Sequence, residues 1–151
     1  MTDAITPATR SNEEVVAARA SVEKTAAGPE GEAVIRTIAM PADTNPAGDV
    51  FGGWLVAQMD LAAGSAAARR AQGRCVTVSI ERVGFNEPVH VGDEVSVHVA
   101  LDRVGRTSMV FDVEAWGRSR DGHARHRVCQ GRFVFVAIDS GGRPRGVPRE
   151  M

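Results

Sequence analysis

A long apolar segment, residues 52–68, limits what this chain can fold into more than any other feature. It contains only three polar side chains, and Asp60 is the only charged one. A helix that is apolar on all sides is normally buried, so the segment predicts a central helix enclosed by other elements. We expect this helix to run over about residues 52–72, with Gly73 as its natural end.

After the helix, the apolar residues repeat every second position, which is typical of β-strands. The alternation slips near Arg82–Gly84 and predicts a β-bulge there. The simplest architecture for this order of elements is α+β, with one curved antiparallel sheet wrapped around one long helix, known as the hot-dog fold. Two subunits are expected to pair along exposed sheet edges. The expected strands are residues 33–40, 76–85, 95–101, 109–115 and 127–138.

The 151 residues fit a single globular domain. Residues 1–33 have few large apolar side chains, so we expect a flexible N-terminal arm followed by the domain over residues 34–151. No apolar run is long enough for a membrane span, and the N-terminus lacks the apolar core of a secretory signal. We therefore expect a cytoplasmic protein without membrane contact. Its two cysteines, Cys75 and Cys129, are expected to stay reduced, with a disulfide or a reactive thiol as the alternatives.

Asp60 is the first candidate for chemistry. None of its helical neighbours three and four residues away can pair with a carboxylate, and burying an unpaired charge is costly. Apolar surroundings raise the pKa of a carboxyl group toward neutrality, which suits a general base or a nucleophile. The structural alternative is that Asp60 meets an arginine from elsewhere in the chain or reaches the surface at the helix edge.

The glycine pair Gly52 and Gly53 lies about two turns before Asp60, on the same side of the helix. The first amides of a helix are unpaired and carry partial positive charge, so they can polarise a carbonyl oxygen. Glycine also lets a ligand approach the backbone closely. An amide donor and a carboxylate in this arrangement are the components for hydrolysing an activated acyl group.

Two polar residues precede the helix. Asp49 is interpreted first as an acidic cap of the helix or a partner of its dipole, with a polar contribution to the active site, including that of a neighbouring subunit, as the alternative. Asn45 has the same two interpretations, and a role as turn former in the loop is favoured for it.

Further candidates lie at the basic C-terminal end, where residues 118–151 carry 8 arginines against 3 acidic residues. Such a surface is compatible with a polyanionic ligand and equally with solvated charge. A second group of candidates lies in the turn before residue 109, which either only connects two strands or also contacts phosphate. The arginines of the tail are either solvated or bind phosphate. These candidates are Arg106, Thr107, Ser108, Arg145 and Arg149.

Several classes of function are disfavoured by the sequence. The four histidines have no metal-ligand spacing, and there is no serine elbow, P-loop or dinucleotide fingerprint. The few aromatic residues do not form the pattern of a nucleic-acid surface. We therefore expect no metal, no cofactor and no nucleic-acid partner.

The chain resembles the YciA-type acyl-CoA thioesterases of the hot-dog superfamily over about residues 34–150. The resemblance is carried by IAMPADTNPAGDVFGGWLVAQMDLAAG, VTVSIERVGFNEPVHVGDEV, VGRTSMVFDVEAW, FVFVAID and RPRGVPRE. It implies hydrolysis of acyl-CoA to free acid and CoA without a metal, in fatty acid metabolism. It also implies hot-dog dimers that assemble into hexamers as trimers of dimers, with active sites at the dimer interface.

The resemblance also implies roles for single residues. Asp60 falls on the catalytic aspartate of the family's QMD element, and Gly52 and Gly53 fall on the amides that polarise the carbonyl. Asp49 occupies a position that is Asn in some branches and Asp in others. The segment Arg106–Ser108 falls near the CoA nucleotide.

Our hypothesis from the sequence is an acyl-CoA thioesterase in which Asp60 either activates water or attacks directly. A hot-dog hydratase would need an acid–base pair, usually with His, and the helix contains no His. A non-catalytic acyl-CoA-binding or sensing module is the alternative outside enzymes.

Overall fold

The computed structural model describes residues 28–149 of the chain, so most of the expected arm, residues 1–33, lies outside the described part. The predicted order of elements is confirmed, with strand ends that differ by a few residues. The elements are β1 (Ile35–Ile38), a 3-10 helix η1 (Pro41–Asp43), α2 (Gly52–Ala71), β2 (Cys75–Phe85), β3 (Glu94–Val104), β4 (Ser108–Arg118) and β5 (Arg125–Ala137).

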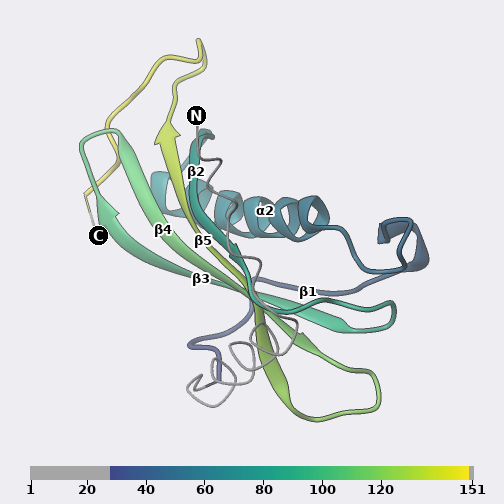
Figure 1. Ribbon diagram of the computed structural model, residues 1–151. Helices are drawn as coiled ribbons and strands as arrows, with labels where there is room; N and C mark the ends of the chain where they lie inside the picture. The colour runs from purple at the N-terminus through teal and green to yellow at the C-terminus, as the bar shows by residue number, and fades with distance from the viewer. Residues whose placement is uncertain (1–27, 150–151) are drawn as a thin grey trace, which may run out of the picture.

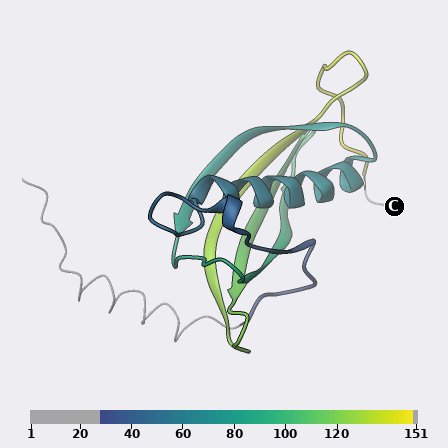
Figure 2. The ribbon, with the colours of Figure 1, turned by 90° about the vertical axis from the view of Figure 1, so that its right-hand side faces the viewer.

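Within the described residues, the five strands form one antiparallel sheet in the order β1-β3-β4-β5-β2. The sheet curves around α2, which lies along its concave side (Figures 1 and 2). The predicted α+β hot-dog fold is therefore confirmed. The predicted bulge is also present, because the pairing of β2 with β5 shifts between Glu81 and Gly84, where Arg82 has a φ of 54°.

Small and flexible side chains of α2 pack against the sheet. Burying a side chain such as that of Leu55 or Met59 contributes about 1.5–3 kcal/mol, and the alanines let helix and sheet approach closely. The opposite side of α2 is open, and Leu61 is 61% exposed there. The expectation that the helix is enclosed on all sides is therefore wrong for the single chain, because one sheet covers only one face. The buried helix residues are Leu55, Met59, Ala62, Ala63, Ala67 and Ala71.

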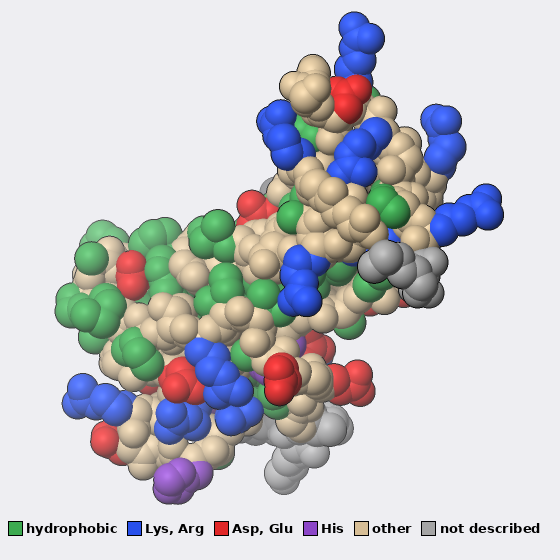
Figure 3. Space-filling view, turned by 180° about the vertical axis from the view of Figure 1, so that it is seen from behind, with side chains coloured by type: hydrophobic (Ala, Val, Ile, Leu, Met, Phe, Trp, Pro, Cys, Tyr) green, Lys and Arg blue, Asp and Glu red, His purple; other side chains and the backbone are tan. Residues whose placement is uncertain are grey.

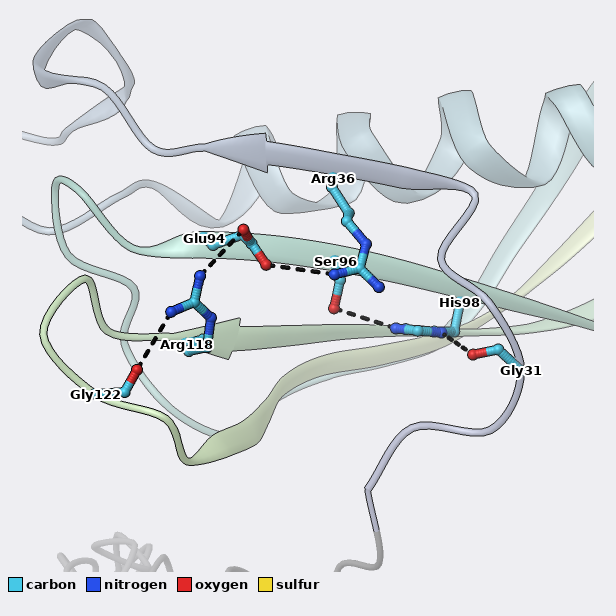
Figure 4. A network of polar contacts seen from close by, with 7 residues as sticks. All are labelled: Gly31, Arg36, Glu94, Ser96, His98, Arg118 and Gly122. Atoms are coloured by element: carbon cyan, nitrogen blue, oxygen red, sulfur yellow. Dashed lines mark hydrogen bonds and ion pairs between the residues drawn. The ribbon is translucent and has the colours of Figure 1, made fainter.

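The outer face of the sheet, away from α2, carries a network of polar contacts (Figure 4). The buried ring of His98 places Nδ1 3.1 Å from the carbonyl oxygen of Gly31 and Nε2 3.1 Å from Ser96 Oγ. Since a carbonyl can only accept, Nδ1 carries the proton of the neutral ring. Burial lowers the pKa of His98 below its ordinary value, and the nearby Arg36 lowers it further. His98 thus ties the chain before β1 to β3.

The same network joins β3 to the loop between β4 and β5. Arg118 donates to Glu94 Oε2 at 3.2 Å and to the carbonyl of Gly122 at 3.3 Å, and Arg36 lies 3.6 Å from Glu94 Oε1 (Figure 4). These contacts hold the segment before β1, β3 and the loop between β4 and β5 together on the outer face. No helix in residues 28–149 is long and apolar enough to cross a membrane.

Candidate active site

The first two residues of α2 present backbone amides that find no acceptor within residues 28–149, whereas Trp54 N donates to Phe51 O at 3.1 Å. Phe51 precedes the helix with an extended backbone (φ −75°, ψ 146°), and no side chain caps the helix. The loop before it is anchored by a hydrogen bond from Val50 N to Val89 O (3.0 Å). The N–H groups of Gly52 and Gly53 are consequently unpaired and lie at the positive end of the helix dipole.

Each of these glycines lies against an aromatic ring. A Cβ atom on Gly52 would lie 2.9 Å from Cε1 of Phe85, and one on Gly53 would lie 3.5 Å from Cδ2 of Phe51. The side chains of Phe85 and Phe51 are nevertheless 55% and 43% exposed. The ring of Phe85 leaves no room for a Cβ atom at position 52, which explains the glycine there. The unpaired amides therefore lie beside an apolar surface.

Asp60 is held from the sheet by Thr77. The hydroxyl Oγ1 of Thr77 donates a hydrogen bond to Oδ1 of Asp60 at 2.7 Å. Thr77 faces the helix because it pairs with Phe135, whose ring is buried on that side of β5. In residues 28–149, Oδ2 of Asp60 has no partner, and the residue is half-buried. The result is a carboxylate oriented by one hydrogen bond, with its second oxygen free to accept a proton.

The surroundings of Asp60 differ from the predicted apolar enclosure. No arginine of the described part pairs with Asp60, and the carboxylate lies at the edge of the open side of α2. Its partner Thr77 is 17 residues away in the sequence, so helical neighbours alone could not reveal it. The carboxylate is therefore neither sealed nor neutralised by an ion pair within the described chain.

The loop residues Asn45 and Asp49 are held to each other. The side-chain oxygen of Asn45 accepts from the backbone N–H of Ala47 (3.0 Å) and of Asp49 (3.1 Å), so Asn45 acts as a turn former. Oδ1 of Asp49 lies 3.4 Å from Nδ1 of His90, and both side chains are about half exposed. The interpretation of Asp49 as a helix cap is wrong, since Phe51 is the N-cap and no side chain caps α2, while its interpretation as a partner of the helix dipole stays a prediction.

A groove lies at the other end of α2, between the turn from β3 to β4 and the C-terminal segment. Its volume is about 510 Å³, and it is lined by three arginines, Arg70, Arg106 and Arg149. Nη1 of Arg70 donates to the carbonyl of Pro148 at 2.6 Å. Basic side chains gather over the end of the molecule that carries the C-terminal segment, and hydrophobic ones gather toward the start of α2 (Figure 3). The groove is therefore a candidate site for an anion.

The remaining predicted residues at this end lie differently. Arg145 directs its guanidinium to backbone carbonyls, Ile138 O (2.9 Å) and Ala71 O (2.9 Å) among them, rather than into the groove. The backbone carbonyl of Thr107 accepts a hydrogen bond from Ala137 N, and Ser108 is the first residue of β4. Neither hydroxyl residue is among those that line the groove.

Comparison with known proteins identifies the family. The family model described as thioesterase superfamily matches residues 47–122. The chain is 51% identical over 120 residues to an uncharacterised acyl-CoA thioester hydrolase of Zymomonas mobilis, covering 80% of each chain. It is 42% identical over 125 residues to the acyl-CoA thioester hydrolase YciA of Escherichia coli, covering 81% of this chain and 95% of that one. The chain belongs to the thioesterase superfamily.

A solved structure extends the likeness to the whole thioesterase fold. The hexameric thioesterase of Yersinia pestis matches with a TM-score of 0.78 and 44% identity, over 82% of this chain and 100% of that one. In this thioesterase-superfamily chain, residues 28–149 hold no group of three or more His, Cys, Asp or Glu side chains placed to bind a metal ion.

Sequence reasoning did not find two residues of this thioesterase-superfamily site. Thr77 lies between the apolar residues Val76 and Val78, but its pairing with Phe135 places Thr77 toward the helix and leaves these valines exposed. Arg70 lay in the basic last turn of α2, where a contribution to the helix dipole is the ordinary explanation. Only the folded tail shows that it lines the groove.

Proposed function

We propose that this chain is an acyl-CoA thioesterase that hydrolyses acyl-CoA to a carboxylic acid and CoA. The observation that carries the proposal is the carboxylate of Asp60, oriented by Thr77 on the same open side of the molecule as an unpaired helix N-terminus. The names of similar proteins, acyl-CoA thioester hydrolases of Zymomonas mobilis and Escherichia coli, support it.

The reaction follows from these groups. The N–H groups of Gly52 and Gly53 polarise the thioester carbonyl and stabilise the negative oxygen that forms when water adds. Oδ2 of Asp60 takes a proton from that water, while Thr77 holds Oδ1 in place. The C–S bond then breaks, and the CoA thiolate leaves and takes up a proton.

Direct attack of Asp60 on the carbonyl carbon would instead form a mixed anhydride that water opens. A single turnover in ¹⁸O-labelled water tests direct attack. Label incorporated into the Asp60 carboxylate indicates direct attack with water opening the anhydride at the Asp60 carbonyl, whereas label found only in the released acid indicates that water added to the acyl carbonyl, of the thioester or of the anhydride.

The active site is proposed to form between two subunits. Gly52 and Asp60 are eight residues apart, about 12 Å along the helix axis, which is more than one carbonyl group bridges. A second copy of α2 on the open side can bring its carboxylate to the amides of the first. The amides of one subunit then act with the Asp60 of its partner, and the site is incomplete in a single chain. In this arrangement Asn45 and Asp49 are polar residues at its entrance.

The edge strand β2 is the proposed dimer contact. It lies at one end of the sheet and pairs only with β5 within the described residues. Antiparallel pairing with the β2 of a second copy would join two sheets and help to cover Leu61. Because the similar Yersinia pestis thioesterase is hexameric, we propose that three such dimers assemble. The exposed apolar residues of β2 are Val76 (41%), Val78 (55%), Ile80 (40%) and Phe85 (55%).

The groove at the end of α2 is proposed to hold the phosphates of CoA. Arg70, Arg106 and Arg149 supply three guanidinium groups, which suit phosphate because they donate in forks. Thr107 and Ser108 stay predictions as further contacts of the nucleotide. We propose a cytoplasmic location, with which the two free cysteines of the described chain agree.

Thiol release from a panel of acyl-CoA esters of different chain lengths tests the proposed function. We expect Asp60→Asn to lower kcat by a factor on the order of 10² to 10⁴, because it removes the proton acceptor. The matched control is Asp121→Asn in the exposed loop between β4 and β5, which should retain wild-type turnover. Wild-type turnover in a folded Asp60→Asn enzyme contradicts the mechanism. Tight acyl-CoA binding without turnover in the wild type would support the non-catalytic binding module instead.

A further inference from the structure

The C-terminal strap, residues 143–149, is the least explained part of the fold. After β5 the chain turns at residues 139–142 and runs back beside the turn between β3 and β4 (Figure 1). Arg145 N donates to Ala137 O at 2.9 Å, and Val147 N donates to Arg106 O at 2.8 Å. The strap thereby becomes one wall of the arginine groove.

The side chain of Arg145 joins this strap to the end of α2. Its Nη2 donates to the carbonyl of Ala71, the last residue of α2, at 2.9 Å, and it lies 3.5 Å from Arg74 O. Its Nε donates to Ile138 O at 2.9 Å. The last carbonyls of a helix lack helical partners and carry partial negative charge, so a cation is favourable there.

A glycine two residues after the helix leaves room for this contact. A Cβ atom on Gly73 would lie 2.7 Å from Nη2 of Arg145, closer than real Cβ contacts occur. A glycine at this position therefore serves the guanidinium as well as the turn. The guanidinium of Arg145 donates to three backbone carbonyls and does not line the groove, so we infer that it does not itself bind phosphate.

The groove depends on where the strap lies. Arg149 belongs to the strap, Arg106 holds the strap through its carbonyl, and Arg70 donates to Pro148 O at 2.6 Å. A shift of the strap would separate these three guanidinium groups. Nε of Arg70 is buried and has no partner among the described residues, so Arg70 has little freedom to follow such a shift.

We propose that Arg145 is a positioning residue, which clamps the strap to the end of α2 and so sets the affinity of the groove for the phosphates of CoA. The inference rests on the proposed function, because that function assigns the groove its ligand. It replaces the direct phosphate contact that the sequence predicted for Arg145. The reacting thioester lies about 15 Å away along α2, near Asp60, so the clamp acts on binding and leaves the chemical step unchanged.

The test compares two substrates with the same acyl group, acyl-CoA and acyl-N-acetylcysteamine, a thioester without phosphates. We expect Arg145→Met to raise KM for acyl-CoA on the order of tenfold with kcat close to wild type. Its kcat/KM for acyl-N-acetylcysteamine should equal that of the wild type. Inhibition by adenosine 3′,5′-bisphosphate should weaken by the same factor as acyl-CoA binding.

Two further variants sharpen the comparison. Arg143→Met is the matched control, since Arg143 lies in the same strap and its hydrogen bonds within the described residues use only its backbone. It should behave like the wild type with both substrates. Arg145→Lys keeps a cation at the end of α2 but loses the fork, so its KM should lie between those of the wild type and Arg145→Met. It carries the test if Arg145→Met does not fold.

Three results would overturn the proposal. Arg145→Met could match Arg143→Met with acyl-CoA, or it could impair both substrates equally, which indicates general structural damage. If the wild type hydrolyses neither substrate, the proposed function fails. Calorimetry with adenosine 3′,5′-bisphosphate then tests separately whether Arg145 sets the affinity of the groove for phosphate. Weaker binding to Arg145→Met than to the wild type then supports it, and no binding to the wild type overturns it.

Discussion

At the scale of single residues, the chemistry proposed for this thioesterase-superfamily chain depends on what holds Asp60. The sequence singled out Asp60 as a lone charge in an apolar helix, and the structure adds a hydroxyl donor 2.7 Å away on β2. A carboxylate with one oxygen bound and one free has a defined direction for proton transfer. Thr77 is therefore as informative about the mechanism as Asp60 itself.

Removing this hydroxyl should slow the chemical step. Thr77→Val keeps the shape of the side chain but loses the donor, and a net hydrogen bond of about 1–1.5 kcal/mol corresponds to a loss in kcat on the order of tenfold. KM for acyl-CoA should change little, because Thr77 does not line the arginine groove. Steady-state thiol release measures both constants.

Thr77→Ser serves as the control, because it retains a hydroxyl and should recover most of the wild-type kcat. If Thr77→Val turns over like the wild type, the hydrogen bond to Asp60 has no part in catalysis.

At the scale of elements, the groups at both ends of α2 follow from helix physics. The positive N-terminus presents unpaired amides at Gly52 and Gly53, and the negative C-terminus is occupied by the guanidinium of Arg145. The first end was predicted from the glycine pair. The contact at the second end was not predicted, because Arg145 is 74 residues from Ala71 and was interpreted as a solvated or phosphate-binding charge.

The amide of Gly52 can be removed without breaking the helix. Gly52 is the first residue of α2, where proline is tolerated, and Phe51 already has the extended backbone that a residue before proline adopts. Both Gly52→Pro and Gly52→Ala add a Cβ against the ring of Phe85, but only proline removes the N–H. We expect kcat of Gly52→Pro to be about 10²-fold below that of Gly52→Ala.

Helix content by circular dichroism checks that both variants fold alike. Equal kcat values for the two variants would show that Gly52 N–H is not the donor and would leave Gly53 N–H as the remaining candidate.

At the scale of the whole molecule, the single chain leaves one side of α2 open and the β2 edge of the sheet unpaired in the described residues. These two features lie next to each other, because Thr77 of β2 reaches Asp60 of α2. Joining a second copy at this edge would cover exposed apolar side chains and complete the proposed site at the same time.

A charge on the free edge should separate the subunits. Val78→Lys places an ammonium group among exposed apolar residues of β2, where pairing with a second β2 would bury two like charges close together. We expect a smaller sedimentation coefficient and loss of thioesterase activity together. Val91→Lys, at a 46% exposed valine in the turn before β3, is the matched control and should leave both unchanged. An unchanged oligomer in Val78→Lys would contradict the proposed contact.

Local sequence patterns were sufficient to predict the central helix, the strands, the bulge near Arg82 and the lone charge of Asp60, since the repeat of apolar residues and the placement of glycine act over a few neighbouring residues. The folded chain was needed to show that Thr77 holds Asp60, that Arg145 binds the end of α2, and that one side of the helix stays open. Such contacts join residues 17 and 74 positions apart, and they depend on how the strands pair rather than on any local pattern.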